Sequence, residues 1–163
     1  MLATTANLTV PDFLRTGDWQ PRPSLATLAS AMDVGNPSNM ERLRWLFPDL
    51  HDLRGEFSAY SVSDDEIRAS IKLDYAEYGQ TWCPHTATAA HLYRQLPAAR
   101  RKERWVLVGT AHPAKFNDVV EPLIGAEVPV PAALADLLSL PSLQQDVSPR
   151  LEDLRTVLKG NPA

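Results

Sequence analysis

Cysteine and long apolar runs are scarce in this sequence. Cys83 is the only cysteine, so the chain cannot form an internal disulfide, which fits a reducing compartment. No apolar segment approaches the roughly 20 residues that a bilayer-spanning helix needs. The first ten residues have neither a basic lead nor a long apolar run. We therefore expect no signal peptide and a cytoplasmic protein.

A strong charge of one sign, metal-ligand spacing and nucleotide-binding motifs are also missing. The formal net charge of -4 gives no electrostatic reason to expect nucleic acid or an anionic membrane as a partner. His51, His85, His91 and His112 are far apart and lack H-E-x-x-H or Cys-pair spacing, so we expect no metal. There is neither a P-loop nor a G-x-G-x-x-G. A Cys83 nucleophile is a weak hypothesis, since a lone cysteine is more often buried and inert.

What is present is an ordinary globular composition with clear helix signals. The chain has 163 residues, of which 44% are hydrophobic and 22% charged, which fits one domain with a substantial core. Ser38 with Glu41 forms a capping-box pattern that predicts a helix to Phe47. Ser63 with Glu66 predicts a second helix in the same way.

Weaker signals complete the coarse assignment. A helix with Thr9 as its cap and a short strand over 57–62 are expected near the beginning of the chain. Pro84 opens an alanine-rich helix that Pro97 stops. Short helices separated by prolines follow after residue 130, and we expect the leucines of the last one to be buried.

The stretch Arg104 to Phe116 carries the most informative local pattern. Trp105 to Val108 is an apolar run too short for a helix, and predicts a strand buried on both faces. Gly109 lets the backbone turn, and Pro113 fits the first turn of a following helix. Open α/β sheets bind ligands where a strand leads into a helix, so residues 110–112 are candidate ligand-binding residues. The alternative is that they serve turn chemistry alone.

Four motifs occur in order along the chain. They are Val10-Pro11-Asp12-Phe13-Leu14 with Gly17-Asp18-Trp19, the A-M-D-V-x-x-P-S-N-x-x-R of Ala31 to Arg42, Pro84-His85-Thr86-Ala87, and the G-T-A-H-P-A-K-F of Gly109 to Phe116. Together they resemble motifs of threonine synthases, which are pyridoxal-phosphate enzymes. The resemblance covers about residues 10–158, and corresponds only to the C-terminal part of such an enzyme.

The resemblance implies a fold and a division of the chain. It implies an α/β fold of pyridoxal-phosphate fold type II, with a partial, mostly parallel sheet flanked by helices and a helical C-terminal tail. The implied parts are a connecting segment (1–23), an α/β core (24–125) and the helical tail (126–163).

The resemblance also implies pyridoxal 5'-phosphate as cofactor, with the Thr110 hydroxyl at its pyridine nitrogen. A hydroxyl donates to an unprotonated nitrogen but cannot stabilise a pyridinium as a carboxylate would. His85 and Thr86 fall in a segment expected to line the substrate or cofactor pocket. Cys83 stands where the family usually carries an acidic residue, which leaves the role of that side chain open.

Two parts of such an enzyme have no counterpart in this sequence. The Schiff-base lysine of an F-K-D segment and the glycine- and asparagine-rich phosphate loop are both absent, and none of Lys72, Lys102, Lys115 and Lys159 lies in such a context. By resemblance, the full enzyme is a lyase of threonine biosynthesis that converts O-phospho-L-homoserine and water to L-threonine and phosphate. We expect no catalytic residue in this chain and no turnover by it alone.

The expected partners are O-phospho-L-homoserine in the full enzyme and the N-terminal part of the same enzyme, with no nucleic acid and no membrane. Two other interpretations stay open. The chain is a non-catalytic module that keeps the fold and binds a ligand or partner, or one half of a split enzyme. A third, membership of a related enzyme such as threonine dehydratase, is disfavoured by the P-S-N and A-H-P-A-K-F motifs.

Overall fold

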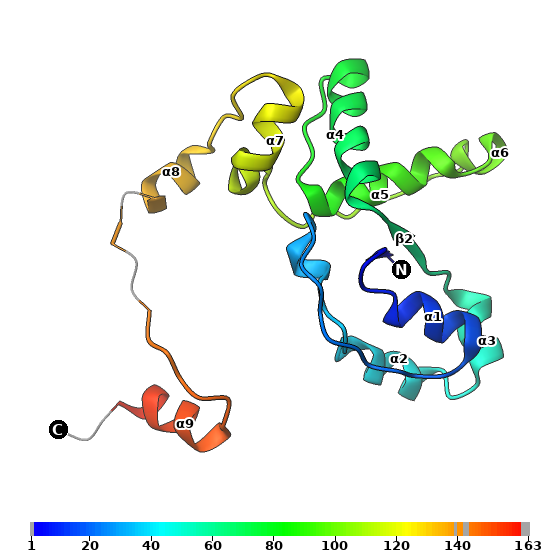
Figure 1. Ribbon diagram of the computed structural model, residues 1–163, viewed down its shortest axis with the longest axis vertical. Coiled ribbons are helices and arrows are strands. Elements are labelled where there is room, and N and C mark those ends of the chain that lie inside the picture. The colour runs from blue at the N-terminus through cyan, green and yellow to red at the C-terminus, as the bar shows by residue number, and fades with distance from the viewer. Residues whose placement is uncertain (1, 139, 142–143, 161–163) are drawn as a thin grey trace. The chain divides into compact units, whose positions relative to one another are not determined.

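Short helices and one small parallel sheet make up the computed structural model, which describes residues 2–138, 140–141 and 144–160. The chain divides between Pro129 and Val130 into two units (Figure 1). The first unit contains β1 (Leu2–Thr4), α1 (Thr9–Thr16), the 3₁₀ helix η1 (Ser30–Met32), α2 (Asn39–Leu46), α3 (Leu50–Glu56), β2 (Tyr60–Val62), α4 (Asp64–Tyr78), α5 (Pro84–Gln95), α6 (Ala98–Arg101), the 3₁₀ helix η2 (Pro113–Phe116) and α7 (Asn117–Ile124). The second contains α8 (Ala132–Leu138) and α9 (Leu151–Lys159).

The sheet joins segments that are far apart in sequence. Strands β1 and β2 pair in parallel, with Leu2 opposite Tyr60 and Thr4 opposite Val62. Helices follow both strands, and further helices form the C-terminal region. The predicted α/β class, with a partial parallel sheet, flanking helices and a helical tail, is confirmed.

Helix α4 is the central element of the first unit and packs against both α5 and α7. The predicted capping box is present, because the Ser63 side chain accepts from the Glu66 N–H while Glu66 accepts from the Ser63 N–H at 2.8 Å. Gly79 ends the helix in the left-handed conformation, at φ 66°. Ile67 and Ile71 are fully buried, in a core whose buried members also include Ala29, Val62, Ala87, Val120 and Val128.

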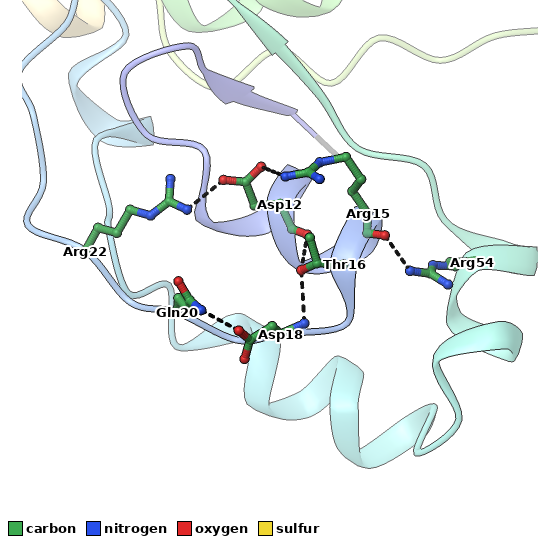
Figure 2. Close-up of polar contacts among 7 residues, drawn as sticks. All are labelled: Asp12, Arg15, Thr16, Asp18, Gln20, Arg22 and Arg54. Carbon is green, nitrogen blue, oxygen red and sulfur yellow. Dashed lines mark hydrogen bonds and ion pairs between the residues drawn. The ribbon is translucent and has the colours of Figure 1, made fainter.

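Helices α1, α2 and α3 form a second apolar cluster around Phe13, Leu14, Met40 and Leu53. Polar contacts connect α1 to Arg22 and to Arg54, as Figure 2 shows. Asp12 is paired with Arg15 at 3.0 Å and with Arg22 at 2.7 Å. Arg54 of α3 donates to the carbonyls of Leu14 and Arg15, at 2.6 and 2.8 Å, and so satisfies two carbonyls at the C-terminal end of α1.

The predicted buried strand at Trp105–Val108 is wrong. Residues 104–110 belong to no helix or strand, and Val106 and Val108 are 82% and 70% exposed. A strand needs a neighbour for its backbone N–H and C=O groups, and in the described part of the chain β1 and β2 pair only with each other. The apolar run therefore has the composition of a strand but no strand beside it.

Three smaller predictions also need correction. Helix α2 forms, but Ser38 has α-helical angles and its side chain makes no cap bond. Helix α1 forms with Leu8 at the cap position, and Thr9 instead donates to the Gly35 carbonyl at 2.8 Å. In α9 the leucines are exposed, with Leu158 at 75%, although the helix itself lies where expected.

Two surveys of the described residues bear on function. None of their helices combines the length and the apolar composition that crossing a lipid bilayer requires. These residues also hold no cluster of three or more His, Cys, Asp or Glu side chains suited to a metal ion.

Candidate functional site

An open cleft in the first unit brings together two of the predicted site residues, Thr110 and Thr86. Its volume is about 730 Å³. Its walls come from the end of α4 and the following loop, the beginning of α5, the segment before η2, and the residues after α7. The lining residues are Gly79, Gln80, Thr81, Trp82, Cys83, Thr86, Gly109, Thr110, Ala111, His112, Pro113, Val128 and Pro129.

Thr110 lies on an exposed stretch of backbone at the cleft wall. Among the described residues, no side-chain hydrogen bond engages its hydroxyl. The segment that carries it is fixed at its far end, because the His112 side chain accepts from the Ala114 N–H at 3.2 Å and caps η2. The Thr110 hydroxyl is therefore available to a ligand in the cleft.

Thr86 and Cys83 line the cleft at the start of α5. Cys83 occupies the cap position, where its sulfur lies 3.5 Å from the Thr86 nitrogen and 3.2 Å from the Thr86 hydroxyl. The thiol is 1% exposed. The sulfur accepts the backbone N–H that an acidic or hydroxyl cap residue would otherwise take. The structure thus gives Cys83 a helix-capping contact.

The cleft has few charged groups. Its described lining contains neither a carboxylate nor a lysine, and His112 is its only histidine. The N-terminal end of α5 adds the partial positive charge of the helix dipole. These features favour a neutral or anionic polar ligand over a cation.

His85 is not among the residues that line the cleft. Its Nε2 accepts from the Ala31 N–H at 3.0 Å, and its ring packs edge-on against Phe116 with centroids 5.0 Å apart. Burial lowers the pKa of His85 below its ordinary value of 6.5, and the nearby Asp33 carboxylate opposes this shift. A neutral ring that accepts at Nε2 carries its proton on Nδ1, which is buried and has no hydrogen-bond partner among the described residues. His85 thus connects α5 to η1 and η2, the element that follows Thr110.

Trp82, which the sequence analysis did not single out, is a further wall of the cleft. Its indole N–H donates to Asp74 Oδ2 at 2.8 Å, and Asp74 is 5% exposed. The other oxygen of Asp74 is paired with Arg94 of α5, and its backbone carbonyl accepts from the Gln80 N–H at 3.2 Å. One helical residue therefore holds both the loop and the tryptophan ring.

Val128 and Pro129 also escaped prediction, because the sequence analysis assigned them to the tail. Gly125 ends α7, and the Val128 N–H then donates to the Glu121 side chain of α7 at 3.0 Å. This hydrogen bond holds residues 128–129 close to α7, where they line the cleft. The only sequence signal was Gly125 in a helix-ending position.

Comparison with known proteins relates this architecture to one enzyme family. A family model described as "Threonine synthase, C-terminal" matches residues 86–158. The threonine synthase of Serratia marcescens is 40% identical over 161 residues, which are 99% of this chain and 37% of that protein. The resemblance predicted from the motifs is thereby confirmed.

Solved structures agree with the sequence comparison. The crystal structure of threonine synthase from Escherichia coli superposes with a TM-score of 0.77 at 34% identity, over 97% of this chain and 36% of that one. The PLP-bound threonine synthase from Brucella melitensis gives a TM-score of 0.65 at 29% identity, over 84% and 35%. This chain spans a little over a third of the length of the relatives that it matches.

Proposed function

Because this chain matches the C-terminal part of threonine synthases, we propose that its cleft forms one wall of a pyridoxal-phosphate site. The observation that carries the proposal is the exposed, unengaged hydroxyl of Thr110 at the wall of a cleft large enough for a pyridine ring. The solved relative from Brucella melitensis, which contains this cofactor, supports the assignment.

The cleft's chemistry fits this cofactor. The cofactor ring is planar and has one nitrogen that must find a donor or an acceptor. A cleft lined by a threonine hydroxyl and by no carboxylate suits the unprotonated nitrogen, which accepts a hydrogen bond. The absence of a lysine from the described lining means that these residues hold the ring by contact only. When bound, the cofactor supplies an electron sink for carbanion chemistry.

Each residue of the cleft has a distinct proposed role. Thr110 donates to the ring nitrogen and keeps it unprotonated. Thr86, whose hydroxyl contacts the Cys83 sulfur, contributes the start of α5 to the substrate or cofactor pocket. His85 acts from outside the cleft, where its contacts with Ala31 and Phe116 hold α5 beside η1 and η2.

We further propose that the chain works with polypeptide that carries the covalent lysine and the phosphate loop. The pair would convert O-phospho-L-homoserine and water to L-threonine and phosphate, and the isolated chain would not. A cytoplasmic setting is part of this proposal, because the single buried Cys83 fits a reducing compartment.

Phosphate release from O-phospho-L-homoserine tests this function. The chain alone should give no release above background, and the chain produced with the N-terminal part should restore release. In that pair Thr110→Val should lower kcat/KM about tenfold, as expected for one lost hydrogen bond of about 1.4 kcal/mol. Thr110→Ser, which keeps the hydroxyl, should retain most of the activity.

Thr156→Val is a matched control, because Thr156 lies in α9 and its hydroxyl donates to the Glu152 carbonyl. It makes the same chemical change outside the first unit and should leave kcat/KM unchanged. If the pair forms a stable complex that releases no phosphate, the alternative of a non-catalytic binding module replaces this proposal. Equal activity of Thr110→Val and the parent pair would remove the role given to Thr110.

A further inference from the structure

We propose that Trp82 is a pre-positioned aromatic wall that contacts the flat face of a planar heteroaromatic ring in the cleft. This inference rests on the proposed function, since it concerns the same cleft as Thr110. It adds a residue that neither the motifs nor the capping patterns single out. Trp82 lies two residues before Pro84, where the recognised P-H-T-A motif begins.

The position of the Trp82 ring supports this proposal. Trp82 is half-buried, and part of its surface packs against the core of the first unit, which includes Val62 and Ala87. Trp82 is also one of the residues that line the cleft, together with Thr86 and Thr110. Trp82 therefore belongs both to the edge of the core and to the lining of the cleft.

The Trp82 ring is also held in place by the protein itself. Its only polar atom donates to Asp74 at 2.8 Å, and this acceptor is itself buried and paired with Arg94. A buried tryptophan N–H usually needs such a partner, and here the partner is a carboxylate fixed on a helix. The loop backbone is fixed by the same residue through Gln80. A ligand therefore has little side-chain entropy to remove when it contacts this ring.

The chemistry of the indole limits what Trp82 can recognise. With its N–H occupied by Asp74, the indole offers the cleft only its π system and C–H edges. Such a surface recognises another flat ring, through offset stacking or edge contact. It has no remaining donor for a phosphate or a carboxylate. Trp82 would thus contact the flat ring of the ligand, and Thr110 would donate a hydrogen bond to the nitrogen of that ring.

The test uses the 163-residue chain, labelled with ¹⁵N and combined with the unlabelled N-terminal part, and 4-deoxypyridoxine as the probe. This pyridine has no aldehyde, so it cannot react with surface lysines. The indole N–H resonances of the four tryptophans report separately on Trp19, Trp45, Trp82 and Trp105 once each is assigned by a Phe variant. Trp19 and Trp45 lie outside the cleft lining and serve as internal controls.

We expect a saturable shift of the Trp82 resonance, with the Trp19 and Trp45 resonances unmoved. Trp82→Leu should weaken probe binding about two- to tenfold, which is the range of an aromatic pair. Trp82→Phe should bind nearly as well as the parent chain, because it keeps an aromatic ring. Urea unfolding shows whether each variant is folded. If Trp82→Leu does not fold, the shift of the Trp82 resonance in the parent chain and the affinity of Trp82→Phe test the proposal instead.

Thr110→Val separates this inference from the proposed function. Binding that Thr110→Val weakens, but that neither moves the Trp82 resonance nor responds to Trp82→Leu, overturns the role of Trp82 alone. Absence of saturable binding, or binding indifferent to Thr110→Val, overturns the proposed cleft function and this inference with it.

Discussion

Replacing Asp74 by alanine should destabilise the first unit far more than removing any surface carboxylate. Asp74 and Arg94 are largely buried, with side chains 7% and 20% exposed, and Asp74 also accepts from Trp82. Removing one member of a buried ion pair costs about 3–5 kcal/mol, because the remaining charge is left without compensation. Since Arg94 keeps some contact with solvent, we expect the lower end of this range, about 3 kcal/mol.

Urea unfolding measures this loss directly. For a slope of about 1.5–2 kcal/mol/M, a loss of 3 kcal/mol lowers the midpoint by about 1.5–2 M urea. Asp65→Ala is the matched control on the same helix, because Asp65 is 95% exposed and pairs with Arg68 on the surface. Asp65→Ala should lower the free energy of unfolding by less than about 1 kcal/mol, and the urea midpoint by less than about 0.5 M. Equal midpoints for the two variants would refute the reasoning that burial makes the Asp74 pair important.

Three further predictions follow from local geometry. Gly35→Ala should destabilise the folded chain by roughly 1–3 kcal/mol, because the alanine Cβ would lie 1.8 Å from the Arg22 carbonyl oxygen. Gly55→Ala in α3 should instead stabilise the chain by about 0.5–1 kcal/mol in the same urea assay, because the new Cβ meets no atom within 4 Å. Hydrogen bonds from the Ser63 N–H and hydroxyl lower the pKa of Glu66 from 4.5. The ionised Glu66 therefore stabilises the folded chain above pH 4.5, and this stabilisation is lost as the pH falls below that value. Glu66→Gln should therefore cost stability at pH 7 and progressively less as the pH falls below 4.5, and an equal cost at both ends would contradict this. Burial lowers the pKa of His85 from 6.5, so as the pH falls the histidine is protonated in the unfolded chain before it is protonated in the folded one. The free energy of unfolding should therefore decrease as the pH drops below 6.5. In His85→Asn this pH dependence should be absent when the same urea unfolding is repeated at each pH.

Local sequence signals predicted the elements whose stability is local. The Ser63–Glu66 capping box and Gly79 predicted both ends of α4, since each end is satisfied by residues within a few positions in sequence. Pro84 predicted the start of α5 for the same reason. The Ser38 pattern failed, because a serine beside a helix start caps it only if its backbone is extended, and here it is helical.

Features that depend on distant partners could not be predicted from local patterns. Trp105–Val108 has strand composition, but pairing requires another strand, and no sequence pattern shows whether one is available. The contact of Trp82 with Asp74 depends on the turn after α4 bringing a loop residue back to the helix. The motif residues Thr86 and Thr110 were predictable as candidates, but their common cleft came from the packing of α4, α5 and α7.

The nitrogen of a bound pyridine ring gives the most direct test of the role assigned to Thr110. With ring-¹⁵N-labelled 4-deoxypyridoxine bound to the parent chain combined with the N-terminal part, the nitrogen chemical shift should be that of an unprotonated nitrogen that accepts a hydrogen bond. Thr110→Ser should preserve that shift, and Thr110→Val should move it toward the value of an unbonded nitrogen. A pyridinium shift in the bound probe, or one identical in all three proteins, would contradict the account.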